Sequence, residues 1–423
     1  MSSTAVLLIS LALLIIINVP ISVSLGLASG ITLLYAGYPI TSIPAILQST
    51  VEKFSLLAIP LFVLAGTAMD EGGISRRLIN LAKMFLGSIT GGLGYVMIVV
   101  SMFFAAISGS GTATVAAIGT IIIPAMIKEG YDPAFSGSLA AISGSMGTII
   151  PPSISFVVYG MITGVSIGDL FLSGFIPGTL FALSLAVIVF IYSKKHGWRG
   201  AKIKYSTKEK WEALKEAFWG ILSPVIVLGG IYGGVFTPSE AAAVASVYSL
   251  FVGIFIYKEI KMKEFVYTLV STVKTTGIIM LIVSCAGVFS YVLQHQGIAA
   301  ALAKQAMTLT SNKYVMLFVI NIIFLIAGCL MDGVSAMYIL LPIIVPVAQA
   351  LNIDLLHLGI ITVVNLSIGQ VTPPVGPNLY VAADVAECKF AEILPKVTPF
   401  LIATITILLI LTYVPWLCTC LVK

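Results

Sequence analysis

The stretch Ser143–Ser153, with the sequence SGSMGTIIPPS, decides how the rest of the chain is interpreted, because it interrupts a long apolar segment. Apolar residues run up to it from Ala134 and continue after it to Ile162. Two adjacent prolines supply no amide donors and disfavour the α conformation in the residue before them, and the glycines tolerate non-helical angles. A helix that crosses a membrane here is therefore expected to break at mid-depth and to leave its ends free to bind an ion.

The same pattern returns later in the chain, in Ser367–Pro377, SIGQVTPPVGP. Gly369 follows Gly147 by 222 residues, and Pro373 follows Pro151 at the same spacing. Repetition at a fixed spacing indicates that the chain holds two copies of one structural unit.

The composition excludes a water-soluble protein. Of the 423 residues, 59% are hydrophobic and 9% are charged, which is typical of an all-α polytopic membrane protein embedded in a lipid bilayer. The net charge of +5 lies in loops, where membrane topology accounts for it, so no nucleic-acid partner is expected. The five cysteines form no C-x-x-C pair and have no neighbouring histidine, so no transition-metal site is predicted.

Each half is expected to contain the same elements in the same order. Two helices joined at a proline turn precede a third helix, an amphipathic stretch, an apolar pair bent at a polar tip, a proline-broken helix and a final helix. The first half covers 1–193, with its hairpin at about 95–126 and its broken helix at about 134–163; a basic linker covers 194–216; the second half covers 217–423, with its hairpin at about 314–348 and its broken helix at about 355–383.

The apolar pairs are interpreted as re-entrant hairpins. Each arm has roughly 13 to 16 residues, whereas a membrane span needs about 20. If the hairpins make no net crossing, each half crosses the membrane five times, so the second half is inverted relative to the first. Inverted repeats with broken helices are typical of secondary transporters.

The basic residues support this topology independently. The linker carries eight of the 22 Lys and Arg residues, which places it in the cytoplasm. Propagating the crossings from the linker puts all but Lys53, Lys304, Lys313 and Lys423 on the cytoplasmic side. Both chain ends are then expected on the outer face, with the first hairpin entering from the cytoplasm and the second from the opposite face.

Polar side chains gather at the hairpin tips and at the helix breaks. The first tip, SGSGTAT at residues 108–114, and the second tip, which contains Asp332, supply hydroxyl, carboxylate and backbone oxygens. Oxygen ligands suit Na⁺, and helix N-termini beside them suit a carboxylate, so each half is predicted to hold a cation site. The alternative is that these small residues only allow helices to pack closely.

Asp332 is the only acid in the second hairpin and is expected to bind a cation or to carry a proton. Alternatively, it caps the helix that follows or is exposed in a wet cavity. Gln370 and Asn378 are expected to contact substrate or, alternatively, to satisfy the unwound backbone beside them. The full set of predicted substrate contacts is Ser145, Ser153, Ser335, Gln370 and Asn378.

Hydrolysis within the membrane is not expected. His196, His295 and His357 are all placed in loops or arms, which leaves no histidine at depth to act as a base for a serine. Asp332 has no second buried acid to pair with, and the sequence contains no H-E-x-x-H motif. The chain is therefore predicted not to be an enzyme.

Four runs of sequence resemble the large membrane subunit of tripartite ATP-independent periplasmic (TRAP) transporters. They are IPLFVLAG (59–66), SMFFAAISGSG (101–111), IIIPAMIKEGY (121–131) and GTIIPPSISFVVYG (147–160). The resemblance covers essentially the whole chain. It implies a Na⁺-driven importer of an acidic solute in the bacterial inner membrane, in which an elevator-type transport domain of hairpins and broken helices moves against a scaffold.

The resemblance also implies partners and ligands. A small four-helix membrane subunit and a periplasmic substrate-binding protein would accompany this chain. The tip sequence favours sialic acid as the solute, with a C4-dicarboxylate next. The implied Na⁺ ligands are Ser108, Gly109, Ser110, Gly111, Thr112, Gly147, Thr148 and Pro151 in the first half, and Gly328, Asp332, Gly333, Gly369, Thr372 and Pro373 in the second.

Three other functions remain open at this point. A stand-alone Na⁺/dicarboxylate or citrate symporter would need no binding protein. A channel would pass solute without coupling, and an accessory membrane scaffold would transport nothing.

Overall fold

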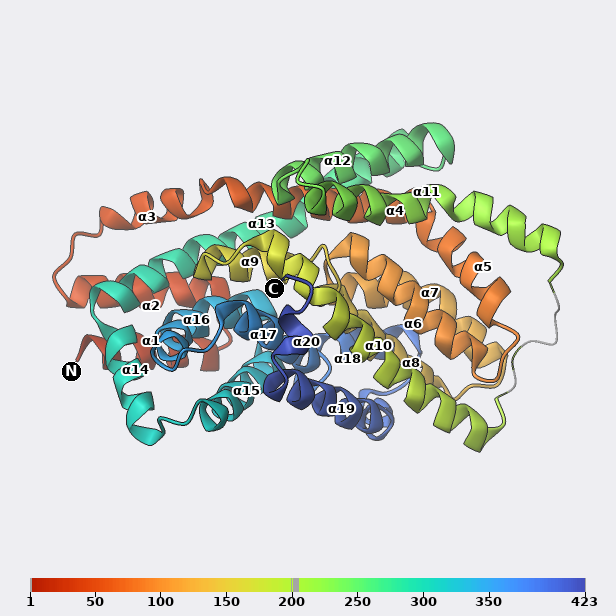
Figure 1. The fold of residues 1–423 in the computed structure, drawn as a ribbon. Coiled ribbons are helices and arrows are strands. Elements are labelled where there is room, and N and C mark those ends of the chain that lie inside the picture. The colour runs from red at the N-terminus through yellow and green to blue at the C-terminus, as the bar shows by residue number, and fades with distance from the viewer. Residues whose placement is uncertain (1, 199, 201–204, 423) are drawn as a thin grey trace.

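A computed structural model describes residues 2–198, 200 and 205–422, and every regular element in them is a helix (Figure 1). Arg199, Lys202, Lys204 and Lys423, which the charge argument includes, lie outside the described residues. The helices of the first half are α1 (Ser3–Ile16), α2 (Ile21–Tyr35), α3 (Ser42–Val51), α4 (Ala58–Glu71), α5 (Ile74–Leu86), α6 (Gly92–Ser108), α7 (Gly111–Lys128), α8 (Pro133–Ser145), α9 (Ile154–Thr163) and α10 (Ile167–His196). Those of the second half are α11 (Thr207–Tyr232), α12 (Pro238–Phe251), α13 (Met262–His295), α14 (Ile298–Leu309), α15 (Lys313–Leu330), α16 (Gly333–Ala350), α17 (Leu355–Gly369), α18 (Pro377–Val385), α19 (Phe390–Tyr413) and α20 (Trp416–Thr419).

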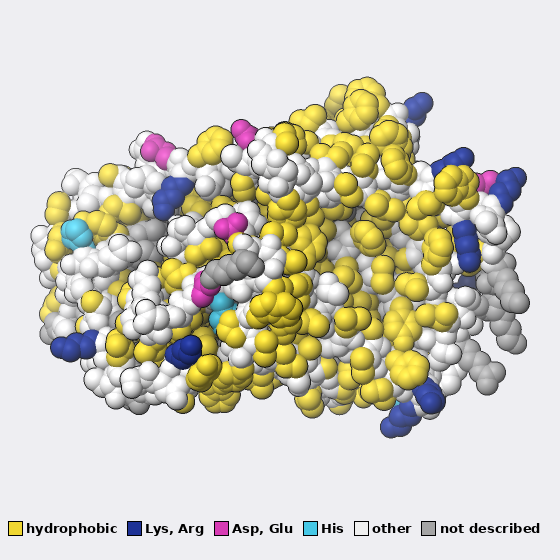
Figure 2. Space-filling view, in the orientation of Figure 1, with side chains coloured by type: hydrophobic (Ala, Val, Ile, Leu, Met, Phe, Trp, Pro, Cys, Tyr) yellow, Lys and Arg dark blue, Asp and Glu magenta, His cyan; other side chains and the backbone are white. Residues whose placement is uncertain are grey.

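The chain is a multi-pass membrane protein. Nine helical segments in the described residues are long and apolar enough to cross a bilayer. Large hydrophobic side chains remain exposed along them, such as Leu183, Val187 and Phe190 on α10. Figure 2 shows hydrophobic side chains over a broad part of one face, with Lys and Arg gathered toward the end where α5 and the start of α11 lie. The predicted all-α polytopic class is confirmed.

The order of the helices repeats at the spacing seen in the sequence. The second arm of the hairpin begins at Gly111 in α7 and at Gly333 in α16. The helix that follows begins at Pro133 in α8 and at Leu355 in α17. Each half therefore presents a hairpin tip and a broken helix at equivalent positions.

The hairpin arms are longer than the sequence predicted. Helix α6 has 17 residues, and α7, α15 and α16 have 18 each, against the roughly 13 to 16 expected. The expected length was wrong because small residues at the ends, such as Gly92 and Ser108, continue the helix. Arm length alone therefore does not separate a re-entrant hairpin from two spans.

The helices form two packed groups. In the frame bundle (α1–α4 and α11–α13), α4 packs against α12 and α13, and α2 packs against α1 and α13. In the hairpin bundle (α6–α10 and α15–α20), α8 packs against α7, α18 and α19, and α15 packs against α17. Helix α5 contacts both α11 and α6, and α14 contacts both α13 and α16, so these two helices connect the bundles.

The broken helices begin in the same way in both halves. Asp132 caps α8, because its carboxylate accepts a hydrogen bond from the Phe135 amide at 2.9 Å. Asp354, which follows Asp132 by 222 residues, caps α17 by accepting from the Leu356 amide at 2.8 Å. These caps fix where each helix enters the hairpin bundle.

Both helices then break at a proline pair. The first break covers residues 146–153 between α8 and α9, and the second covers 370–376 between α17 and α18. The Pro151–Pro152 and Pro373–Pro374 peptide bonds are both cis. Because proline donates no hydrogen bond, the chain leaves the helix here and its carbonyl groups turn toward other partners.

The prediction that all three histidines lie in loops or arms is wrong. His196 and His295 are the last residues of α10 and α13. His357 is buried in the first turn of α17, because that helix already begins at Leu355, directly after the Asp354 cap. Its Nε2 lies 2.9 Å from the Leu411 carbonyl oxygen, which gives the ring a structural partner.

Candidate functional site

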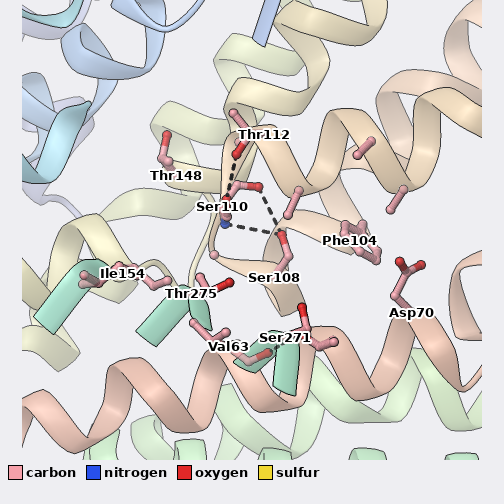
Figure 3. Close-up of a pocket in the computed structure, with 18 of the residues that line it drawn as sticks. Val63, Asp70, Phe104, Ser108, Ser110, Thr112, Thr148, Ile154, Ser271 and Thr275 are labelled. Carbon is pink, nitrogen blue, oxygen red and sulfur yellow. Dashed lines mark hydrogen bonds between the residues drawn. The ribbon is translucent and has the colours of Figure 1, made fainter. Parts of the chain in front are cut away.

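A cavity of about 530 Å³ lies where the frame bundle meets the hairpin bundle, a size typical of small-molecule sites. Both hairpin tips, both helix breaks, α4 and α13 contribute to its wall. In the close-up, the first tip lies across the cavity from Ser271 and Thr275 (Figure 3). The predicted site residues that line the cavity are Ser108, Gly109, Ser110, Gly111, Thr112, Thr148, Asp332, Gly333 and Gln370.

The first tip presents a group of oxygen atoms. The chain turns at Gly109, whose φ of 60° suits glycine. Ser108 Oγ lies 3.0 Å from Thr114 Oγ1, which donates to the Ser110 carbonyl oxygen at 2.7 Å. The Ser110 side chain caps no amide of α7, and its Oγ lies 3.4 Å from Thr112 Oγ1. Hydroxyl and carbonyl oxygens in such a cluster are ligands for a small hard cation.

At each helix break, a glycine allows the facing hairpin to approach closely. A Cβ on Gly147 would lie 2.5 Å from the Ser110 carbonyl oxygen, and a Cβ on Gly369 would lie 2.5 Å from the Gly328 Cα. Real Cβ atoms essentially never approach that closely, so a side chain at either position would push the tip away. Sequence reasoning singled out these glycines as cation ligands, whereas their clearest role here is close packing.

The second tip carries a carboxylate where the first carries a hydroxyl. Asp332 precedes α16 as Ser110 precedes α7. Its carboxylate accepts from the Ser335 amide at 3.0 Å and from the Ser335 hydroxyl at 2.6 Å, so it caps α16. Asp332 is also exposed in the cavity. Asp332 therefore both caps the following helix and is exposed in a cavity, which were the two alternatives to a binding role. Its negative charge remains at the cavity wall.

The two halves meet directly at the first tip. The position of a Cβ on Gly111 is 2.4 Å from Gln370 Oε1 and 3.4 Å from Asn378 Oδ1, so the amides of the second break and of the first turn of α18 both lie against this glycine. Asn378 donates to the Ala141 carbonyl oxygen at 3.3 Å, but its buried Oδ1 accepts no hydrogen bond from any described residue. A buried oxygen without a donor beside the first tip suits a cation.

Several predicted contacts lie away from the cavity surface. Ser145 donates to the Ile142 carbonyl, Ser153 donates to the Thr148 carbonyl, and Ser335 donates to Asp332. These hydroxyls donate to local backbone and caps, as serine commonly does near helix ends. Their substrate role stays a prediction. The other predicted residues that do not line the cavity are Gly147, Pro151, Gly328, Gly369, Thr372, Pro373 and Asn378.

Sequence reasoning missed the wall that the frame bundle supplies. Thr67, Asp70 and Glu71 of α4 line the cavity, as do Ser271 and Thr275 of α13. The latter two are four residues apart and therefore share a helix face. That spacing was the only available signal, because the sequence alone did not show that this face meets the hairpin tips.

The charged side chains of the cavity wall are all acidic. They are Asp70, Glu71 and Asp332, and no Lys or Arg lines the cavity among the described residues. Such a wall attracts cations and disfavours an unaccompanied anion. An acidic solute would therefore bind here together with a cation.

The sequence profile of the family described as "Tripartite ATP-independent periplasmic transporter, DctM component" matches residues 8–417. The chain belongs to this family. This TRAP permease is similar to the isethionate TRAP transporter permease protein DctMQ of Oleidesulfovibrio alaskensis, with 43% identity over 96% of this chain and 64% of that protein. The chain thus spans somewhat less than two thirds of that relative. As a TRAP secondary transporter permease it is not an enzyme, as predicted.

Two further relatives match the TRAP permease over most of their own length. The C4-dicarboxylate TRAP transporter large permease protein DctM of Pseudomonas aeruginosa is 42% identical over 93% of this chain and 92% of that protein. The sialic acid TRAP transporter large permease protein SiaM of Vibrio cholerae is 38% identical over 86% of this chain and 85% of that protein. Relatives at similar identity are thus named for different solutes.

Solved structures share the fold of the TRAP permease at low identity. The YdaH transporter of Alcanivorax borkumensis gives a TM-score of 0.65 at 16% identity, covering 99% of this chain and 100% of that one. MtrF of Neisseria gonorrhoeae gives a TM-score of 0.63 at 15% identity, covering 98% of this chain and 96% of that one. The likeness concerns the fold alone.

Proposed function

We propose that this chain is the solute-carrying subunit of a Na⁺-coupled importer of an acidic organic solute. The observation that carries the proposal is the cavity in which both tips and both breaks meet an acidic wall. Helix ends and unwound carbonyls at one place can bind ion and solute together. Coupling then follows, because each ligand orders backbone that the other also contacts.

The transport movement is an elevator. The two halves are inverted repeats, the hairpin bundle is the transport domain, and the frame bundle is the scaffold. This assignment is supported by the packing of the two bundles and by the distribution of basic residues, which favours re-entrant hairpins and a cytoplasmic linker. Both chain ends then face the periplasm, and the cavity lies toward the cytoplasmic ends of α4 and α13.

Two Na⁺ sites fit the oxygen groups at the tips. The first would use the Ser108–Thr112 tip with the break that follows Gly147, and the unpartnered Asn378 Oδ1 beside Gly111 supports it. The second would use Asp332 and Gly333 with carbonyl groups near Thr372. Each bound ion neutralises negative charge, which lets a carboxylate solute approach a wall that carries no basic side chain.

The proposed partners are those of the family. A separate small four-helix membrane subunit would complete the scaffold, and a periplasmic substrate-binding protein would deliver the solute in the bacterial inner membrane. Sialic acid is the favoured solute and a C4-dicarboxylate is the next. The hydroxyl-rich first tip supports the first choice, and relatives named for both solutes keep the second open.

Reconstituted uptake tests this proposal. Proteoliposomes that hold this chain and its small subunit are given labelled sialic acid or succinate, with and without an inward Na⁺ gradient and the cognate binding protein. Uptake that requires both the gradient and the binding protein is the expected result. Uptake with Na⁺ alone would indicate a stand-alone symporter. Equal uptake with and without the Na⁺ gradient would overturn the proposed coupling of solute transport to Na⁺.

A further inference from the structure

A second cavity, of about 500 Å³, lies at the other end of the contact between the bundles. It is bounded by α3 and the residue Lys53 that follows it, by the last turns of α13, and by α16. Its polar lining includes Thr50, Ser290 and Gln294. Its volume is in the range of sites that bind small organic molecules.

The charge of this second cavity is opposite to that of the first. Lys53 is its charged lining residue, and no Asp or Glu lines it among the described residues. Lys53 takes part in no ion pair within the described chain. The neighbouring Glu52 accepts a hydrogen bond from the Gln48 amide at 2.6 Å, so its carboxylate has another partner. An exposed ammonium group at the wall of this cavity therefore remains available to an anion.

The internal repeat relates the two cavities. Ser49 and Lys53 precede Ser271 and Thr275 by 222 residues, and each pair lines its own cavity from the frame bundle. At these two frame-bundle positions, the second cavity is therefore lined by the repeat equivalents of residues that line the first. The difference is that a lysine stands where the first cavity has a threonine.

The polar wall around Lys53 is held in place by close helix packing. A Cβ on Gly287 of α13 would lie 2.2 Å from Thr50 Oγ1, so α3 and α13 touch at this point. Ser290 and Gln294 are four residues apart and share a face of α13. Hydroxyl and amide groups thus share the cavity wall with the ammonium group, and apolar side chains such as Met161, Leu341 and Val345 complete the wall, an arrangement that suits an organic anion with both a carboxylate and an apolar part.

We propose that the second cavity binds the carboxylate of a soluble organic anion, with Lys53 as its charged group and Ser290 and Gln294 as neighbouring donors. The site receives the solute on the outer face, before the solute reaches the acidic cavity with its cation. That role rests on the proposed function, because the orientation and the solute are taken from it. Binding by Lys53 itself does not depend on Na⁺.

Binding without Na⁺ isolates this site. The purified chain is placed in nanodiscs of phosphatidylcholine, in choline chloride buffer, and the affinities for radiolabelled sialic acid, succinate and isethionate are measured without any binding protein. Lys53→Gln should weaken the affinity for at least one probe by about three- to tenfold, and Lys53→Arg should retain it. Lys304→Gln is the matched control, because Lys304 is exposed on α14 and does not line the cavity.

Three results would overturn the proposal. The first is equal affinity in Lys53→Gln and Lys304→Gln, and the second is no binding of any probe to the unaltered chain. The third is an effect of Lys53→Gln that appears only when phosphatidylglycerol is added, which would indicate a lipid headgroup site. If the unaltered complex shows no Na⁺-driven uptake, the proposed function is overturned, whatever Lys53 binds.

Discussion

The two halves of the chain place their hairpin tips and helix breaks at equivalent positions, but the tips differ in backbone and in chemistry. The first tip turns at Gly109 with a φ of 60°, whereas the equivalent Met331 of the second tip is extended with a φ of −145°. Both breaks carry a glycine that leaves no room for a side chain, Gly147 against the Ser110 carbonyl oxygen and Gly369 against Gly328 near the end of α15. The residue before the second arm is Ser110 in one half and Asp332 in the other. The comparison teaches that the repeat conserves the space between tip and break, while the charge at the tip is free to change and can make the two sites unequal.

The largest effect is expected at the glycines that the halves share. Gly147→Ala and Gly369→Ala place a methyl group against backbone atoms that cannot move aside, so uptake should fall more than tenfold in both variants. Uptake in proteoliposomes measures this, with size-exclusion chromatography to confirm folding. Gly229→Ala is the control, because a Cβ at that position meets no atom within 4 Å. Normal uptake in one of the two variants would break the equivalence of the tips.

A smaller effect should separate the tips. Asp332→Asn keeps a good helix cap but removes the charge, so the Na⁺ concentration for half-maximal uptake should rise about tenfold. Ser110→Ala removes one neutral oxygen and should raise it about two- to fourfold. Na⁺ activation curves for both variants make the measurement. Equal shifts would show that the carboxylate adds nothing to the second site.

The smallest effect concerns the caps that start the broken helices. Asp132→Ala and Asp354→Ala should each lower the free energy of unfolding by about 1 kcal/mol at pH 7, because each removes a side-chain cap. Melting temperatures in detergent measure both variants. A loss in only one of them would show that the two halves start these helices differently.

The effect of Asp132 should also depend on pH. Burial alone raises the pKa of Asp132, but the hydrogen bond from the Phe135 amide and the Lys396 ammonium group 3.1 Å away outweigh it and lower the pKa. The carboxylate therefore stabilises the fold above its unfolded pKa of about 3.9 and loses this effect as the pH falls through the folded value. A difference between wild type and Asp132→Ala that stays constant down to pH 3 would contradict this.

The sequence alone predicted the local features well. A proline pair flanked by glycines and apolar residues breaks a helix whatever surrounds it, so both breaks were placed from composition and spacing. Arm lengths were underestimated because glycine and serine at a helix end are compatible with either helix or turn. His357 was misplaced because the cap at Asp354, which starts α17, was not recognised.

What depends on tertiary contacts was not predicted. Asp70 and Ser271 line the cavity only because α4 and α13 of the frame bundle face the tips. Conversely, Ser145 and Ser153 looked like ligands, but nearby carbonyl groups already accept from their hydroxyls. Polar residues near a break can contact the solute or the backbone, and the sequence alone does not show which backbone groups lie within their reach.

The interleaving of the halves has a consequence for biogenesis. Helix α8 of the first half packs against α18 and α19 of the second, and Ser138 of α8 donates to the Ile393 carbonyl of α19 at 3.2 Å. Helix α4 likewise packs against α12, which is synthesised later. During synthesis, the first half therefore stays in the bilayer with its serine-bearing faces uncovered for roughly ten to forty seconds while about 200 further residues are added. Until the second half is inserted, these polar faces need the insertion machinery or another protein to cover them. The exposure of polar groups to lipid is therefore greatest during synthesis, before the protein transports any solute.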